Sequence, residues 1–501
     1  MAAALTRTGV VFTRETEGLT EDNVVGRTDI IGLLGTPNDF NGTYLTGNKV
    51  QPIVFTDDLS RVYVGGNGVV YVIDTLSFKL ISTIAIEAGK NISSLATAGN
   101  LLIIGEGNSY GAGAGGNRLL VMDINPGSAH YNQAISLKNT GIEQSSLGVT
   151  GMIVGPDGHT LVVAVPRVSG VTSLQGFKDP GDILVLDLNT LNFQTGTIAT
   201  PVKAQLPGNA SRSGKAPQVI SATKDADRYL VGSVGDYNRG LSTLVLTRDD
   251  EGTVTSAVMT AIDMTQKGSD VRRDRLDIQR AQSAVLVEYQ GVEYAIVADD
   301  NFNFNDPYWK AMFEAPMLLF PPFGPPMAYG GSVSARKVAV GGKLGIIQDP
   351  FGEAKFIGAT LPLDGYGIAN LSVSPDGKVL IGQLNGRYGT LDAWQQKPHQ
   401  SHAWDVQALI AAALAHPEEE RMRKHIVLPN QYELLIPTPS SAPAGTFFDA
   451  DPVQVKVEGR LGDIIQVDLK RQVAHALLGL PAPSDDLNVV QRAAIAALQN
   501  K

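Results

Sequence analysis

The sequence of 501 residues predicts an all-β protein that is built from repeated four-stranded units. Short apolar runs alternate with turn residues over most of the chain. Glycine and proline are abundant, with 54 and 27 residues, and only 18% of the residues are charged. Strand-like runs that follow one another without a helical period indicate antiparallel meanders.

Residues 50–86 show the repeated unit most clearly. Three strand-like runs occupy 51–56, 61–64 and 69–74, and a fourth extends over 78–84. The first three runs are closed by aspartate or glycine, which are turn residues. A single four-stranded meander cannot bury both of its faces, so the sequence predicts further copies stacked beside it.

Six degraded copies of this unit follow along the chain. The expected first strands are centred on Ile53, Leu95, Ile153, Ile220, Val285, Val338 and Val373. Their mean spacing is about 53 residues, which exceeds the roughly 40–45 residues of a minimal propeller blade. The sequence therefore predicts a seven-bladed β-propeller that carries insertions in most blades, followed by a small mixed α/β extension.

Two turns and two strand motifs resemble a known repeat. The turns are Ser374-Pro375-Asp376-Gly377 and Gly155-Pro156-Asp157-Gly158, and the motifs are Arg61-Val62-Tyr63-Val64 and Val72-Ile73-Asp74-Thr75. Together they resemble the YVTN-type β-propeller repeat over about residues 50–395. The resemblance implies a bacterial protein of the cell surface or extracellular space. It says little about function, because propellers carry many functions.

Composition excludes several classes of protein. A net charge of −10 argues against a general nucleic-acid binder, because phosphate contacts need clustered lysine and arginine. The chain has no cysteine, which rules out disulfides and thiolate metal sites. No signal peptide is visible at the N-terminus, and no apolar stretch is long enough to span a membrane.

Three regions are expected along the chain. Residues 1–49 hold a strand that we expect to close the ring, since an open ring leaves unpaired edges. The propeller occupies 50–395. Residues 396–501 alternate helical and strand patterns, including a helical pattern over 402–416. The last helical pattern has no stop signal, so we expect the native chain to continue into neighbouring domains.

Residues 299–306 form a candidate cation site. Oxygen-bearing side chains alternate there, and the expected ligands are Asp299, Asn301, Asn303 and Asp306. Ca²⁺ prefers six to eight oxygen ligands. However, Phe304 stands where an EF-type loop needs glycine, and asparagine-rich turns also cap their own backbone. A calcium site and a simple turn both remain open, and we expect no other cofactor.

The segment after it is rich in aromatic and proline residues, so it cannot be a core strand of a blade. Its candidate partner-binding residues are Trp309, Phe313, Phe320, Phe323 and Met327. The segment either covers the propeller as an apolar plug or forms an exposed binding surface. Both alternatives remain open at the level of sequence.

No catalytic signature is present. The sequence contains no nucleophile elbow, since Gly330-Gly331-Ser332-Val333-Ser334 lacks the last glycine, and it contains no H-E-x-x-H. We therefore expect a non-catalytic binding or architectural module that recognises a protein or carbohydrate partner through its rim loops. The alternative is a lactonase-like hydrolase with a divalent cation in the central channel, with Asn370 and Gln218 as examples of channel-facing candidates.

Overall fold

A computed structural model places most of the strand-forming chain. It describes residues 2–6, 9–13, 24–29, 49–50, 52–66, 68–87, 90, 92–107, 116–144, 148–165, 181–205, 216–234, 240–264, 278, 281–299, 342–360, 367–374, 376–385, 400–418, 431–432 and 446–447. Structural statements below refer to these residues.

Six four-stranded antiparallel sheets follow one another in chain order. The first sheet contains β5 (Ile53–Phe55), β6 (Arg61–Gly65), β7 (Val69–Asp74) and β8 (Lys79–Ala85). The second contains β9 (Ile92–Ala98), β10 (Leu101–Glu106), β11 (Leu119–Asp123) and β12 (Ala134–Ser136). The third contains β13 (Gly151–Val154), β14 (Thr160–Val165), β15 (Asp182–Asp187) and β16 (Val202–Gln205).

The other three sheets have the same order. The fourth contains β17 (Ala216–Ala222), β18 (Arg228–Val234), β19 (Leu241–Arg248) and β20 (Val254–Ala261). The fifth contains β21 (Ala281–Tyr289), β22 (Val292–Asp299), β23 (Leu344–Gln348) and β24 (Lys355–Ala359). The sixth contains β25 (Gly367–Val373), β26 (Val379–Asn385), β27 (Gln400–Asp405) and β28 (Gln431–Tyr432).

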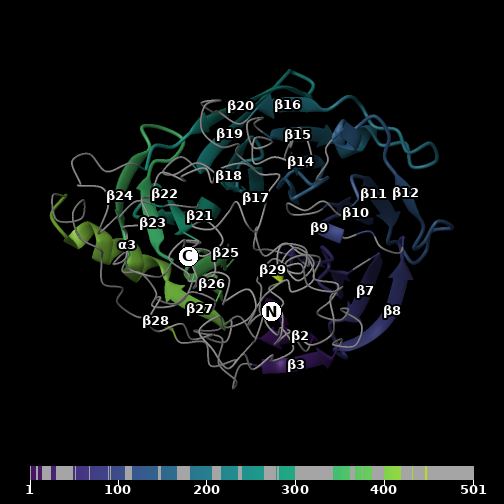
Figure 1. The fold of residues 1–501 in the computed structure, drawn as a ribbon, viewed down its shortest axis with the longest axis horizontal. Coiled ribbons are helices and arrows are strands. Elements are labelled where there is room, and N and C mark those ends of the chain that lie inside the picture. The colour runs from purple at the N-terminus through teal and green to yellow at the C-terminus, as the bar shows by residue number, and fades with distance from the viewer. Residues whose placement is uncertain are drawn as a thin grey trace, which may run out of the picture.

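These sheets are arranged around a common centre as the blades of a β-propeller. The first strand of each sheet contacts the first strand of the next, from β5 to β25. Figure 1 shows these strands near the middle of the ring and the fourth strands, such as β8 and β20, at its circumference. The prediction of an all-β propeller is therefore confirmed.

The N-terminal segment forms a sheet of its own. Its strands are β1 (Ala2–Thr6), β2 (Gly9–Thr13) and β3 (Val24–Asp29), which pair only with one another among the described residues. This sheet lies beside the first one, because Phe12 stacks on Phe78 and the Thr28 hydroxyl donates to the Phe78 carbonyl. Figure 1 places it between the sixth and first sheets. The total of seven blades stays a prediction.

A second contact joins the two ends of the described chain. The short strand β4 (Lys49–Val50) pairs with β29 (Thr446–Phe447), which comes from the C-terminal region. We expected the N-terminal segment to close the ring by adding a strand to another blade. Among the described residues it forms a separate three-stranded sheet and one strand of this two-stranded pair, and closure of the ring by a shared strand stays a prediction.

One predicted unit is wrong. The run that follows Val338 was expected to begin a new blade, but its apolar residues form β23, the third strand of the fifth sheet. Ala298 of β22 pairs with Leu344 of β23. Val338 itself lies outside the described residues. The other six predicted anchors all lie in first strands of sheets.

The sixth sheet extends past the boundary that we expected near residue 396. Its third strand is β27, in which Trp404 pairs with Leu380. Consequently the expected helix over 402–416 begins later, and α3 spans Val406–Ala415. The described part of the chain beyond residue 396 therefore begins as a propeller strand.

Apolar side chains fill the spaces between neighbouring sheets. All residues of β14 are buried, and most residues of β7 and β22 are buried as well. The helix α3 buries Val406, Leu409, Ile410 and Ala413 in the cluster shared by the fifth and sixth sheets. Two short 3₁₀ helices, η4 (Ile142–Gln144) and η6 (Leu188–Thr190), complete the described elements. No helix in this part of the chain has the length and apolarity to cross a membrane.

Candidate functional site

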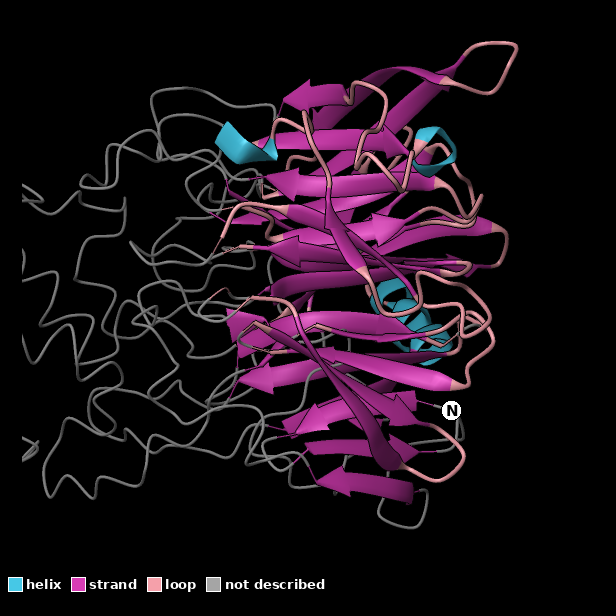
Figure 2. Ribbon diagram, turned by 90° about the vertical axis from the view of Figure 1, so that its right-hand side faces the viewer, coloured by secondary structure: helices cyan, strands magenta, loops and turns pink. Residues whose placement is uncertain are grey.

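The two ends of the ring differ in the connections that they carry. At one end, which we call the turn face, the first strand of each sheet turns into the second and the third turns into the fourth. At the other, the loop face, the second strand leads to the third and each sheet leads to the next. Figure 2 shows the short turns and α3 gathered on one side of the sheets, which is the turn face.

Most of the long connections leave the loop face. The second and third strands are separated by residues 166–181 in the third sheet and by 300–343 in the fifth. On the turn face, by contrast, β21 and β22 are joined by only Gln290 and Gly291. Surface loops that a rigid scaffold positions are the usual carriers of recognition.

A buried carboxylate marks the loop face of the second sheet. Glu106 ends β10, and its side chain is 0% exposed. Arg118 donates from Nε to Oε2 at 2.8 Å and from Nη2 to Oε1 at 2.5 Å. The same Nη2 lies 2.5 Å from Oε2 of Glu87. The hydrogen bond with Glu106 raises the pKa of Arg118, so this cation is held beside two carboxylates.

Gly116 makes this arrangement possible. Its φ of +84° lies in the left-handed region, and a Cβ there would stand 2.5 Å from Oε2 of Glu106. Any larger residue would therefore press on the buried carboxylate.

A second buried pair occupies the same place in the fifth sheet. Asp299 ends β22, and Lys343 directly precedes β23. The Lys343 Nζ lies 3.7 Å from the Asp299 Oδ2, and these side chains are 3% and 0% exposed. In both sheets the amide of the acidic residue donates to the carbonyl of the cationic residue at 2.9 Å. The two pairs therefore occupy equivalent positions, between the end of the second strand and the start of the third.

Buried charges are costly unless they are paired, and removing one partner leaves the other charge uncompensated. The pairs therefore fix the points at which the second strand ends and the third begins. Asp182, which starts β15 in the third sheet, is 3% exposed at the corresponding level. The first and fourth sheets carry small or uncharged residues there, and Gly66 and Ser233 donate to Val69 and Gly240.

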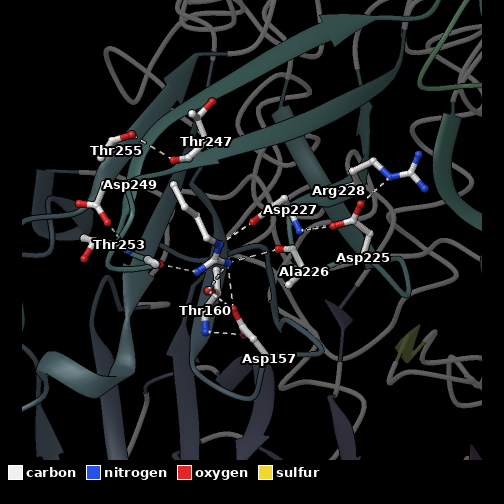
Figure 3. A network of polar contacts seen from close by, with 12 residues as sticks. Asp157, Thr160, Asp225, Ala226, Asp227, Arg228, Thr247, Asp249, Thr253 and Thr255 are labelled. Carbon is white, nitrogen blue, oxygen red and sulfur yellow. Dashed lines mark hydrogen bonds and ion pairs between the residues drawn. The ribbon is translucent and has the colours of Figure 1, made fainter.

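The turn face is occupied by contacts within the protein. Arg248, at the end of β19, reaches across to the third sheet and bonds Asp157 Oδ2 at 2.9 Å and Thr160 Oγ1 at 3.0 Å. It also bonds Asp227 Oδ1 at 2.5 Å within its own sheet (Figure 3). Burial alone would lower the pKa of Arg248, but its bonds with Asp227 and the charges of Asp227 and Asp157 raise it.

Other sheets are tied together in the same way. Arg228 bonds both carboxylate oxygens of Glu293 in the fifth sheet and lies 4.5 Å from the ring centre of Phe351. Arg61 donates to the Tyr131 hydroxyl of the second sheet at 2.9 Å. Three arginines of the turn face thus join neighbouring sheets.

Of the cation ligands and partner-binding residues that the sequence predicts, only Asp299 lies in the described residues. Asp299 lies buried beside Lys343, so its carboxylate already has a cation next to it. A calcium ion there would share that carboxylate with a positive charge. The other expected ligands, Asn301, Asn303 and Asp306, lie outside the described residues, as do Trp309, Phe313, Phe320, Phe323 and Met327.

No group of three or more histidine, aspartate or glutamate side chains in the described ranges could hold a metal ion. The backbone of Asn370 and Gln218 lies in β25 and β17, the first strands of their sheets. Sequence reasoning missed Glu106, Arg118 and Lys343. The sequence signal that could have revealed these residues is a charged residue directly at the end or the start of an apolar strand run.

No known protein family and no characterised protein sequence matches the chain. Among solved structures, hydrazine synthase of Kuenenia stuttgartiensis is similar at 16% identity and a TM-score of 0.44, over 79% of this chain and 90% of that one. The β-propeller domain of Cps50 (Swd1) from Myceliophteria thermophila has 12% identity and a TM-score of 0.37, over 72% and 83%. Dihydro-heme d1 dehydrogenase NirN has 13% identity and a TM-score of 0.41, over 76% and 55%. Likenesses this distant carry no argument about function.

Proposed function

We propose that the protein is a non-catalytic binding or architectural module whose loop face recognises a protein or carbohydrate partner. Its repeats resemble the YVTN type, and that resemblance supports a place in a bacterial surface or secreted protein, next to further domains of the native chain.

The single observation behind this proposal is the contrast between the two faces. Charged side chains on the turn face, such as Arg248 and Arg228, are engaged with neighbouring sheets. The loop face carries most of the long connections, and two buried charge pairs lie at the strand ends from which two of them leave. A face whose loops vary on a fixed scaffold suits recognition.

The aromatic insertion after Asp299 supplies the proposed contacts. Trp309, Phe320 and Phe323 are the expected anchors, because aromatic side chains dominate interface energetics. Nearby prolines stiffen the segment, which lowers the entropy lost on docking. Phe313 and Met327 belong to the same proposed surface.

Photo-crosslinking in the producing cells tests which face binds. A photoreactive amino acid is placed at Ala85, an exposed residue at the loop-face end of β8, and in a second variant at Thr260, near the loop-face end of β20. Matched controls carry it at Leu76 and Asp250, which are exposed in the turns that precede the same two strands.

We expect covalent adducts from the two loop-face positions and none above background from the two turn-face positions. Mass spectrometry of the adducts identifies the partner if it is a protein, and glycan analysis identifies it if it is a carbohydrate. Adducts that form only from Leu76 and Asp250 would reverse the assignment of the faces.

A further inference from the structure

The turns between the first two strands repeat with a period of three sheets. In the first and fourth sheets, six residues separate the paired strand ends, and both turns begin with threonine, have aspartate third and end with arginine. The aspartate Oδ1 accepts from the amide two residues on, at 3.0 Å for Asp58 and 2.9 Å for Asp225. Arg61 and Arg228 each reach the next sheet.

The turns of the third and sixth sheets also have six residues with aspartate third, but the residues around the aspartate differ. Both contain Pro-Asp-Gly, and Gly158 and Gly377 have φ values of +77° and +73°. Asp157 accepts from the His159 amide and Asp376 from the Lys378 amide, each at 3.1 Å. Neither turn ends with the arginine that the first and fourth sheets place there.

The second and fifth sheets also share a type of turn. Theirs are the only two-residue hairpins between first and second strands in the described sheets, with Ala98 opposite Leu101 and Tyr289 opposite Val292. These same two sheets carry the buried charge pairs. In Figure 1 their second strands, β10 and β22, lie on opposite sides of the ring.

We infer that the six described four-stranded sheets form two matched halves of three, and that the Glu106–Arg118 and Asp299–Lys343 pairs are equivalent positioning residues for the binding face. Each pair holds the root of a loop-face connection in its own half. This inference rests on the proposed function, because it assigns the pairs to the recognition that the loop face performs.

The geometry favours positioning over simple stabilisation. Each pair lies where the chain leaves the sheet, and each is reinforced by a backbone hydrogen bond between the same two residues. Lys343 and Asp299 are almost fully buried, so the loss of one charge removes the nearby opposite charge from a buried group, which is costly. The strand ends from which the two connections leave would then shift.

Neutral variants of the full-length protein test this inference. The substitutions are Glu106→Gln, Asp299→Asn and both together, with Asp250→Asn as an exposed turn-face control. Circular dichroism confirms folding at the assay temperature. Hydrogen exchange then reports on peptides that contain residues 106–119 and 299–344, and crosslinking from Ala85 and Thr260 reports on binding.

We expect each single variant to accelerate exchange in its own half only. The double variant should reduce loop-face crosslinking to the level of the turn-face controls, and Asp250→Asn should match the wild type. A folded double variant with unchanged exchange and crosslinking would overturn the inference.

Should a neutral variant fail to fold, Asp299→Leu combined with Lys343→Met replaces both charges with apolar groups, which buried pairs often tolerate. This variant should fold and lose crosslinking from Thr260, which lies in the same half, whereas full crosslinking from Thr260 would mean that the pair only stabilises the sheet. A wild type that gives no loop-face adduct refutes the proposed function instead. In that case the exchange of the two segments alone decides whether the pairs position them.

Discussion

Arg248 and Lys378 both form ion pairs on the turn face, but they differ in burial. The Arg248 and Asp157 side chains are 17% and 16% exposed, whereas Lys378 and Asp376 are 72% and 55% exposed. Solvent screens an exposed pair, and its two side chains lose entropy when they are held together. A buried pair that also carries hydrogen bonds leaves an uncompensated charge when it is broken.

Arg248→Met should therefore lower the free energy of unfolding by about 1.5–3 kcal/mol, the usual range for hydrogen bonds to charged groups. Lys378→Met should change it by less than about 1 kcal/mol. Urea titration of the two variants measures the difference. Equal losses would contradict the role that we give to the Arg248 contacts.

The aspartates of the turns predict how stability depends on pH. Three hydrogen bonds lower the pKa of Asp58 to about 2. The bond from the Thr56 hydroxyl has the largest effect, and the amide and hydroxyl of Ser60 donate the other two. Burial alone would raise the pKa of Asp157. Hydrogen bonds from the hydroxyl and amide of Thr160 and from the amide of His159 outweigh burial and hold this pKa below its ordinary value.

A carboxylate with a lowered pKa contributes stability above its unfolded pKa of about 3.9, and this contribution is lost as the pH falls through the folded value. The contribution of Asp58 should therefore disappear between about pH 4 and pH 2. An NMR titration of Asp58 should give a midpoint near 2, and Thr56→Val should raise it. A wild-type midpoint at the ordinary value would contradict the hydrogen bonds assigned to this turn.

Residues of the site differ in how far the sequence reveals them. Asp157 and Asp376 stand in Pro-Asp-Gly turns, whose geometry is local and therefore readable. The partners Asp299 and Lys343 are separated by an insertion, so their contact depends on the pairing of β22 with β23. No local pattern carries that information.

At the scale of the element, α3 begins where its cap dictates. The Asp405 side chain accepts from the Ala408 amide at 2.8 Å, which satisfies one of the amides left unpaired at a helix start. The preceding residues, including Trp404, pair with β26 as strand β27. Apolar spacing alone placed the helix start too early, whereas the cap residue marks the true boundary.

Asp405→Ala should reduce the free energy of unfolding by about 0.5–2 kcal/mol, because it removes this cap. Asp405→Asn keeps an acceptor oxygen and should stay close to the wild type. Denaturant unfolding followed by circular dichroism compares the two variants. A loss in Asp405→Asn as large as that in Asp405→Ala would contradict the role that we give to the hydrogen bond with the Ala408 amide.

Strands in the first sheet were predictable almost to the residue, because turn residues bound each apolar run. The expected run 69–74 is β7 itself, and 61–64 is β6 less one residue. The strand β23 was assigned to the wrong unit, because residues 300–343 separate it from the strands that it joins. The sequence predicts where a strand lies, whereas pairing over long separations depends on tertiary contacts.

For the whole molecule, hydroxyl groups join the innermost strands of neighbouring sheets. Thr97 donates to the Phe55 carbonyl, Ser93 to that of Val149, and Ser221 to that of Ala284. Ser283 accepts from the Leu371 amide at 3.2 Å. Together with the turn-face ion pairs, these bonds fix the sheets against one another, while most of the long connections leave from the loop face.

The double variant Phe320→Ser with Phe323→Ser separates the two interpretations of the aromatic insertion. For a binding surface, we expect a nearly unchanged melting temperature and the loss of loop-face crosslinking. For a plug, each lost phenylalanine should cost about 3–5 kcal/mol, as in a protein core. A melting temperature that collapses in the double variant would contradict the binding surface.

Hydrogen exchange of the full-length protein, alone and bound to the crosslinked partner, shows which face of the ring binds. We expect binding to slow exchange in segments that end at the loop face, including 66–69, 106–118 and 299–343. Exchange in the turn-face segments 57–60, 157–160 and 249–253 should stay the same. Protection confined to those turn-face segments would contradict the assignment of the loop face as the binding face.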